Sequence, residues 1–297
     1  MNNLHHIERL GIELIKQMKK DDMDISFDFL SFGIATEFLR AIMGNDWVNE
    51  TAFSQHSEVS HFNREARKYF KTEETSIPER YKHQHRIISL ANKIIELSNI
   101  KGFPSKFKKI SKGGLESISA ELECASQLHR SGLNISFIEE TGTRGSDFDI
   151  LIQIDEDSTI NCEIKAKIEG TSLSKNTILR SLNKSRKQLP KDNPAVIFLK
   201  IPEDWIFDQT IKTTLEETII EFFRNTTRVI SVIIRWDTSN EIQEGFLIAT
   251  KFNVYLNKNI SIQQSSIEAL KRIEYHQSGF HTPITDISKK LIEQLYK

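Results

Sequence analysis

Acidic, basic and apolar residues alternate along residues 147–167, where the sequence predicts two strands of a β-hairpin. Successive side chains of a strand point to opposite faces, so Asp147 and Asp149 share one face of the first strand. Glu163 and Lys165 share one face of the second strand for the same reason. The apolar residues of both strands take the other face. The pattern therefore gathers carboxylates and an amine on one side of the hairpin.

Carboxylates and an amine in this arrangement are suited to the hydrolysis of phosphodiester bonds. Two or three carboxylates that converge on one point repel each other unless a hard cation lies between them. A bound Mg²⁺ or Mn²⁺ can acidify a water molecule and neutralise charge on a phosphate, and a lysine beside it can stabilise the developing negative charge. The alternative is a polar face that is only solvated, as in many antiparallel hairpins. A helix expected before the hairpin and another after it weigh against that alternative.

Hydrophobic periodicity predicts the elements that have to position these groups. The first of them are a helix at 115–131, which ends near Gly132, and strands at 133–139, 147–154 and 159–167. The elements expected after them are a helix at 175–189, a strand at 195–201, a helix at 208–224, strands at 228–236 and 246–255, and a helical tail from 264. This alternation predicts an α/β fold in which helices flank a mixed central sheet.

The residues before this core are predicted to be helical, with apolar helices at 27–43 and 78–98. Five lysines and no acid follow between Lys101 and Gly114, which predicts a boundary there. The expected parts are a helical N-terminal region at 1–110, which would bind substrate or a partner or mediate dimerisation, and the α/β domain at 111–297. The lysine segment itself is interpreted as a flexible linker or as a surface that binds a phosphate backbone.

Composition limits the kinds of protein that the chain can be. The net charge of -1 excludes a global basic field, so a nucleic acid would have to be bound by local basic patches. The two cysteines, Cys124 and Cys162, are flanked by apolar residues and are expected to be buried thiols in a reducing compartment. No run of 18 apolar residues is present, so no membrane span is expected. The N-terminus lacks the architecture of a signal peptide, which favours a cytoplasmic location.

The segment Ser146–Ile152 followed by Asn161–Lys167 resembles the PD-(D/E)xK superfamily of restriction-endonuclease-like nucleases. The predicted helix before them matches the E-x3-A-x2-L-x3-G spacing of that superfamily's first core helix, at Glu121, Ala125, Leu128 and Gly132. The resemblance covers about residues 115–201 and implies a restriction-endonuclease-like fold. In that fold the order is helix, three-stranded meander, helix and strand. The sequence departs from the name motif because no proline precedes either aspartate.

The resemblance implies a metal-dependent nuclease, with DNA as the favoured substrate and Mg²⁺ or Mn²⁺ as the cofactor. Glu163 would be a metal ligand and Lys165 the catalytic lysine. Asp149 is the favoured second ligand because it directly precedes an apolar strand, but Asp147 remains open. Glu121 would be the helix-borne acid that completes or tunes the site. A role in prokaryotic defence or mobile-element biology follows from the resemblance alone.

The helix that follows the catalytic strand is rich in basic residues and contains no acid. The residues expected to contact nucleic acid there are Lys175, Arg180, Lys184, Arg186 and Lys187, with Arg144 in the turn before the aspartates. A solvated basic face is the alternative for the helix, and a turn residue is the alternative for Arg144. Gln188 could support the site. The competing hypothesis for the whole chain is a nuclease-like subunit without catalysis that binds nucleic acid or protein. A homodimer or a partner subunit remains open.

Overall fold

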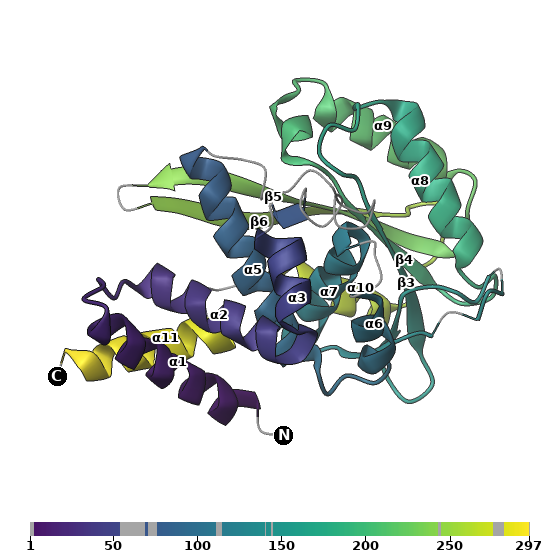
Figure 1. The fold of residues 1–297 in the computed structure, drawn as a ribbon. Coiled ribbons are helices and arrows are strands. Elements are labelled where there is room, and N and C mark those ends of the chain that lie inside the picture. Colours follow the sequence, from purple (N-terminus) through teal and green to yellow (C-terminus); the bar gives the residue numbers. More distant parts are fainter. Residues whose placement is uncertain are drawn as a thin grey trace.

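The computed structural model describes residues 3–53, 69–70, 76–110, 115–139, 141–143, 145–242, 245–275 and 282–296 (Figure 1). They form an α/β fold on a six-stranded mixed sheet in which the strands neighbour one another in chain order. The strands are β1 (Asn134–Phe137), β2 (Ile150–Gln153), β3 (Thr159–Ala166), β4 (Ala195–Lys200), β5 (Val229–Ile242) and β6 (Gly245–Leu256). The first three strands are an antiparallel meander, β3, β4 and β5 run parallel, and β6 is antiparallel to β5. The predicted α/β class with a mixed sheet is confirmed.

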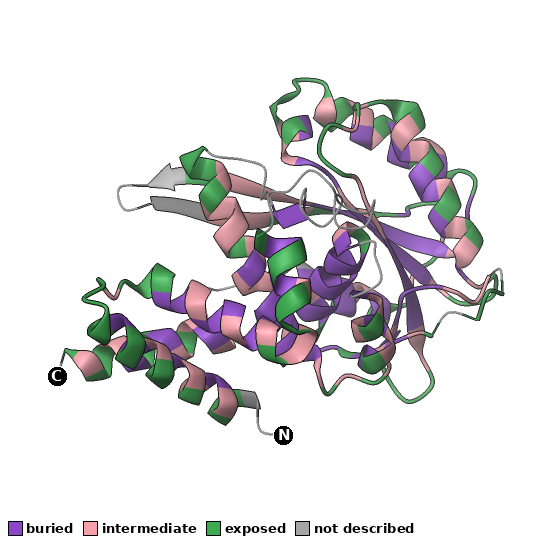
Figure 2. Cartoon of the chain, viewed as in Figure 1, coloured by how far each residue is buried: buried purple, intermediate pink, exposed green. Residues whose placement is uncertain are grey.

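Helices cover both faces of this sheet. The helices next to it are α5 (Ile77–Leu97) and α7 (Leu115–Arg130) on one face, and α8 (Lys175–Gln188) and α9 (Ile211–Phe223) on the other (Figure 1). Val196 and Phe198 of β4 pack on the α7 side, whereas Ile197 and Leu199 pack on the α8 side. A strand covered on both faces needs a continuous apolar run, which β4 has, and Figure 2 shows it as buried. The order α7, β1 to β3, α8, β4 is the predicted order of elements.

Both ends of the chain contribute to the helical layer beyond α5 and α7 (Figure 1). The remaining elements are α1 (Asn3–Lys20), α2 (Phe27–Met43), α3 (Asn45–Val48), the π-helix η1 (Asn49–Phe53), α6 (Phe103–Ile110), the 3₁₀ helix η2 (Glu203–Phe207), α10 (Gln264–Tyr275) and α11 (Pro283–Leu295). The C-terminal α11 packs against α1, α2 and α5. A Cβ atom at Gly11 of α1 would lie 2.4 Å from Leu291 Cδ1 of α11, so a larger residue there would require the end of the Leu291 side chain to shift. One apolar core continues from these helices into the sheet across the division expected at residue 110.

The expectation of a flexible linker at 101–114 is wrong for its described part, because Phe103–Ile110 form the helix α6. Phe103, Lys106 and Ile110 are its buried residues, at spacings that place them on one helical face. The chain enters α6 through Gly102, whose φ of +82° favours glycine. A Cβ atom there would lie 2.2 Å from the carbonyl oxygen of Phe137 in β1. The lysine segment is therefore fastened to the sheet, and one of its lysines points inward.

The core between α7 and β3 contains both cysteines. Cys124 and Cys162 are buried and free, as predicted, and their Sγ atoms lie 4.0 Å apart. Their neighbours in sequence include Glu121, one turn earlier on α7, and Glu163, the next residue on β3. The apolar interface of these two elements therefore holds the two acids in fixed positions relative to each other. Within the described ranges, no helix is both long and apolar enough to cross a membrane.

Candidate active site

Asp149 lies where the pairing of β2 with β3 ends. Strand β2 begins at Ile150 rather than at the predicted residue 147, so the backbone before Asp149 has already left the sheet. The amide of Asp149 still donates to the carbonyl of Cys162 at 3.1 Å. Its carboxylate Oδ2 accepts a hydrogen bond from the amide of Ile164, two residues after Cys162 on β3, at 2.8 Å. The side chain thus takes the place of a backbone acceptor, which holds the Asp149 carboxylate beside β3.

Asp147 does not share this position. Its Oδ1 accepts from the backbone amide of Thr141 at 2.7 Å and from the Thr141 hydroxyl at 2.8 Å. The backbone N–H of Thr141 lowers the pKa of Asp147. The expectation that Asp147 and Asp149 lie on one strand face is wrong because residue 147 precedes the strand. Gln188 of α8 donates to the Asp147 carbonyl at 3.4 Å, so it supports this turn. Of the two candidates, Asp149 is the one that the structure brings to β3.

Glu121 reaches the same place from α7, through a residue that sequence reasoning missed. The Nζ atom of Lys106 donates to Glu121 Oε2 at 2.6 Å and lies 3.6 Å from Asp149 Oδ1. Lys106 is 2% exposed, and Glu121 and Asp149 are 8% and 9% exposed. A single buried ammonium group therefore lies between the two carboxylates. The predicted approach of Glu121 to Asp149 is present in the structure, but it is mediated by this lysine.

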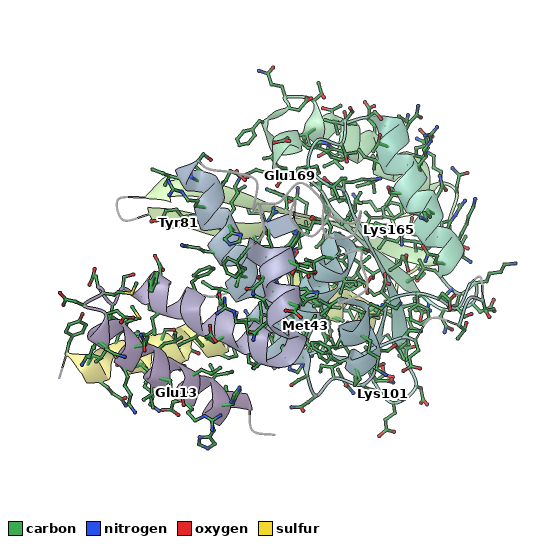
Figure 3. All side chains as sticks on the ribbon, in the orientation of Figure 1. Glu13, Met43, Tyr81, Lys101, Lys165 and Glu169 are labelled. Atoms are coloured by element: carbon green, nitrogen blue, oxygen red, sulfur yellow. The ribbon has the colours of Figure 1, made fainter. Side chains whose placement is uncertain are left out.

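Glu163 and Lys165 complete the group from β3. Glu163 is fully buried, and its Oε1 accepts a hydrogen bond from the ammonium group of Lys165, which is labelled in Figure 3. The other carboxylate oxygen, Oε2, is buried and has no hydrogen-bond partner among the described residues. A buried carboxylate oxygen without a partner is costly and calls for an explanation such as a bound water or ion. We call Lys106, Glu121, Asp149, Glu163 and Lys165 the carboxylate cluster.

Two acids of the carboxylate cluster, Glu121 and Glu163, have pKa values raised towards their neutral forms. Burial, and then the charge of Asp149, raises the pKa of Glu163 to about 8, although Lys165 opposes this. Burial, and then Asp149, likewise raises the pKa of Glu121 to about 7 against the effect of Lys106. The cluster therefore contains more carboxylates than its two ammonium groups can neutralise. An additional cation would favour the ionised form of each acid, and strongly shifted pKa values of this kind concentrate at functional sites.

The donor set of the cluster fits a hard divalent cation, because Glu121, Asp149 and Glu163 offer carboxylate oxygens and one of these is without a partner. No three acidic, histidine or cysteine side chains within the described ranges already surround a common point at metal distances. Two of these acids, Glu121 and Asp149, instead contact the ammonium group of Lys106. The lysine supplies the positive charge that a cation would otherwise supply.

Comparison of the chain with protein-family models, with curated proteins and with solved structures finds no match. The function therefore has to be inferred from the residues of the site themselves. Two further groups of charged residues lie close enough to the carboxylate cluster in the fold to bear on it. One is the basic surface of α8, and the other is a second buried charge cluster on α7.

The basic residues of α8 divide into two sets. Arg180, Lys184 and Lys187 are exposed at spacings of four and three, so they form one ridge along the helix. They line a groove together with Asn176, Leu179 and Asn183. Burial and then the nearby charge of Lys184 lower the pKa of Lys167, the first residue after β3. Lys184 of the ridge therefore lies near the end of β3.

The other basic residues predicted to contact nucleic acid have partners within the protein. Lys175 forms an ion pair of 2.6 Å with Glu221 of α9. Arg186 donates to the carbonyl of Asn225, and its guanidinium carbon lies 5.9 Å from the centre of the Phe222 ring. Both side chains thus fasten α8 to the α9 region instead of forming part of the exposed ridge. The predicted contact residue Arg144 lies outside the described residues.

A second buried acid, Glu123, lies two residues after Glu121 on α7 but belongs to a different group. It accepts from Lys200 of β4 at 2.8 Å and from Arg235 of β5, and Lys93 of α5 lies 3.5 Å away. Asp237 shares Lys200 and Arg235, each at 3.3 Å. Burial alone would raise the pKa of Glu123, but the charges of Arg235, Lys200 and Lys93 hold it well below its usual range. This network, in which both oxygens of Glu123 have cationic partners, joins α5 and α7 to the sheet.

Proposed function

We propose that the chain is a metal-dependent nuclease that hydrolyses phosphodiester bonds on a restriction-endonuclease-like core. The supporting observation is that two ion-paired groups lie next to each other along β3. Lys106 contacts Glu121 and Asp149, Asp149 accepts from the Ile164 amide, and the adjacent Glu163 is paired with Lys165. These elements occur in the order that the PD-(D/E)xK resemblance implies. Within this group, Glu163 Oε2 is buried and has no hydrogen-bond partner among the described residues.

Glu121, Asp149 and Glu163 would hold Mg²⁺ or Mn²⁺. When bound, the cation supplies an acidified water and neutralises charge on the phosphate. The Asp149 carboxylate is fixed by the Ile164 amide, and the Glu163 carboxylate is fixed by burial and by Lys165. Lys165 is the most exposed member of this set, with 23% of its side chain accessible, so its ammonium group can meet a substrate. Its positive charge beside the reacting phosphate would stabilise the negative charge that develops there.

DNA is the substrate class that we favour. A phosphate backbone that followed the α8 ridge of Arg180, Lys184 and Lys187 would approach Lys167 and then Lys165 on β3. Local basic ridges of this kind supply the sequence-independent part of nucleic-acid affinity. They are also the only way for a chain with a net charge of -1 to attract a polyanion.

The second candidate function is a nuclease-like subunit without catalysis that binds nucleic acid or protein. One observation favours it, namely that the described acids are arranged around the ammonium group of Lys106 rather than around an open metal position. In this alternative the carboxylate cluster is a structural charge network. Binding to nucleic acid through the α8 ridge would then continue without cleavage.

Cleavage assays separate the two functions. Purified protein is incubated with supercoiled plasmid, linear duplex, single-stranded DNA and RNA, each with Mg²⁺, with Mn²⁺ and with chelator. Wild-type protein should cleave DNA only with a divalent cation, and Glu163→Gln should be inactive but folded. Glu156→Gln, an exposed acid in the turn between β2 and β3, is the matched control and should retain full activity. Equal residual cleavage by wild type and by Glu163→Gln would refute the nuclease proposal.

A further inference from the structure

Lys106 is an unusual member of the carboxylate cluster because it comes from outside the predicted core. Its neighbours on α6 include the exposed Lys108, yet Lys106 itself is 2% exposed. Phe103 and Ile110 are buried on the same face of α6 and set the direction of the Lys106 side chain. The helix is held against β1 at Gly102, where a larger residue would collide with the Phe137 carbonyl. The fold therefore delivers this one ammonium group to Glu121 and Asp149.

The charges of the cluster show what this ammonium group replaces. If all three carboxylates are counted in their ionised forms, they exceed the two ammonium groups by one negative charge. Without Lys106, the three carboxylates and Lys165 would carry two negative charges, which is the charge that a divalent cation neutralises. A buried carboxylate without a partner is strongly unfavourable, so these acids must either take up protons or be matched by positive charge. Lys106 can provide it and can also withdraw, because its ammonium group is carried on a flexible four-carbon stem.

We propose that Lys106 is a built-in counter-ion that occupies the cation position of the carboxylate cluster and competes with a divalent metal for Glu121 and Asp149. The inference rests on the proposed function, since it assigns the same acids to the metal. Metal binding displaces the ammonium group from the two carboxylates. The lysine keeps the acids together when no metal is bound and sets the metal concentration at which the site fills. Lys106 is thus a positioning residue rather than a catalytic one.

A purely structural role for Lys106 would have different consequences. A lysine that only neutralised the acids would not be displaced by a metal. In the same cluster, Glu163 Oε2 is without a partner in the described part of the chain. In the Glu123 network, by contrast, three cations surround the acid and its carboxylate oxygens are paired. The carboxylate cluster is therefore still short of positive charge when Lys106 is in place, and its unpaired oxygen belongs to a predicted metal ligand.

The test measures Mn²⁺ binding to the full chain in the absence of nucleic acid. Binding is monitored as the loss of the electron paramagnetic resonance signal of free Mn²⁺. Lys106→Met removes the charge and keeps the length of the side chain, and Lys108→Met is the matched control on the exposed side of α6. Removal of a competing buried charge should tighten Mn²⁺ binding by about ten- to a hundredfold. The control should bind as the wild type does. Mn²⁺ should also raise the melting temperature of Lys106→Met more than that of the wild type.

The outcomes distinguish the two levels of the proposal. If Lys106→Met binds Mn²⁺ no more tightly than the wild type while Glu163→Gln loses binding, the metal site stands and the counter-ion role is refuted. If neither the wild type nor Lys106→Met binds Mn²⁺ and no substrate is cleaved, the proposed function itself fails, and the inference fails with it. Lys106→Gln, which keeps a polar donor, serves as a second variant. Folding of either variant only with Mn²⁺ supports the proposal, and failure to fold with or without Mn²⁺ overturns it.

Discussion

The substitution Glu163→Gln should make the metal-free protein more stable above neutral pH while it removes activity. Glu163 has no exposed surface, and burial together with Asp149 raises its pKa to about 8. The pKa of a glutamate in the unfolded chain is about 4.3. An acid whose pKa is raised on folding contributes its full stability below the unfolded pKa and loses it as the pH rises to the folded pKa. Between these two pH values the folded protein therefore loses stability relative to the unfolded chain, because the unfolded glutamate ionises while the buried one stays neutral.

The magnitude follows from the size of the shift. Each pKa unit corresponds to about 1.4 kcal/mol, so at pH 7 the cost of Glu163 is on the order of 3 kcal/mol. Glutamine has nearly the same shape and carries no charge, so the variant avoids this cost. It also loses the hydrogen bond with Lys165, but that ammonium group is partly exposed and can be solvated instead. The net gain in the free energy of unfolding near pH 7.5 should therefore lie at about 1–3 kcal/mol.

Urea unfolding in the presence of chelator measures this difference. At pH 5 the wild type and Glu163→Gln should have nearly equal unfolding free energies, and the gap should open as the pH rises to 8. Glu156→Gln should follow the wild type throughout. Addition of Mn²⁺ should stabilise the wild type and leave Glu163→Gln unchanged. A variant that is less stable than the wild type at pH 7.5, or that has the same pH dependence, would show that Glu163 does not carry this charge cost.

Three further predictions concern the neighbouring residues. Lys165→Met should reduce cleavage by at least about a hundredfold while Mn²⁺ binding persists, and loss of binding in this variant would show a ligand-positioning role instead. Glu123→Gln should lower the free energy of unfolding by about 3 kcal/mol, because three buried or half-buried cations lose their shared partner. A change below about 1 kcal/mol in urea unfolding would contradict this prediction. Replacement of the three ridge residues, Arg180, Lys184 and Lys187, by glutamine should weaken DNA binding. It should also reduce the slope of log K against log salt concentration by about three, whereas Lys175→Gln should have little effect. An unchanged slope would exclude the ridge as a phosphate contact.

The sequence predicted those parts of the site that depend on local periodicity. Alternation along β3 placed Glu163 and Lys165 on one face, and the structure has them in contact. The apolar run of β4 predicted a strand covered on both sides, which it is. Helical spacing on α7 and the resemblance placed Glu121 near the aspartates. Each of these features needs only the direction of a side chain relative to its own element.

Features that depend on the packing of distant elements could not be predicted in the same way. Alternation alone did not distinguish Asp147 from Asp149, because it did not show that the strand begins at Ile150. The lysine-rich composition suggested a linker at 101–114. For that reason, the buried face of α6 was not predicted. The spacing of Phe103, Lys106 and Ile110 was the available evidence for that face. The partners of Lys175 and Arg186 come from the α9 region, about forty residues further along the chain. No local sequence pattern predicts these contacts.

Glu121 and Glu123 show why burial alone does not identify a functional acid. They are two residues apart on α7 and are 8% and 7% exposed, yet the pKa of Glu121 is raised and that of Glu123 is lowered. Glu123 contacts Lys93, Lys200 and Arg235, and Asp237 shares the last two, so this network has three cations for two acids. The carboxylate cluster has three acids for two cations and leaves one oxygen without a partner. A deficit of positive charge is a property that a bound cation can correct, and this difference is the physical reason for assigning the chemistry to Glu121, Asp149 and Glu163 rather than to the Glu123 network.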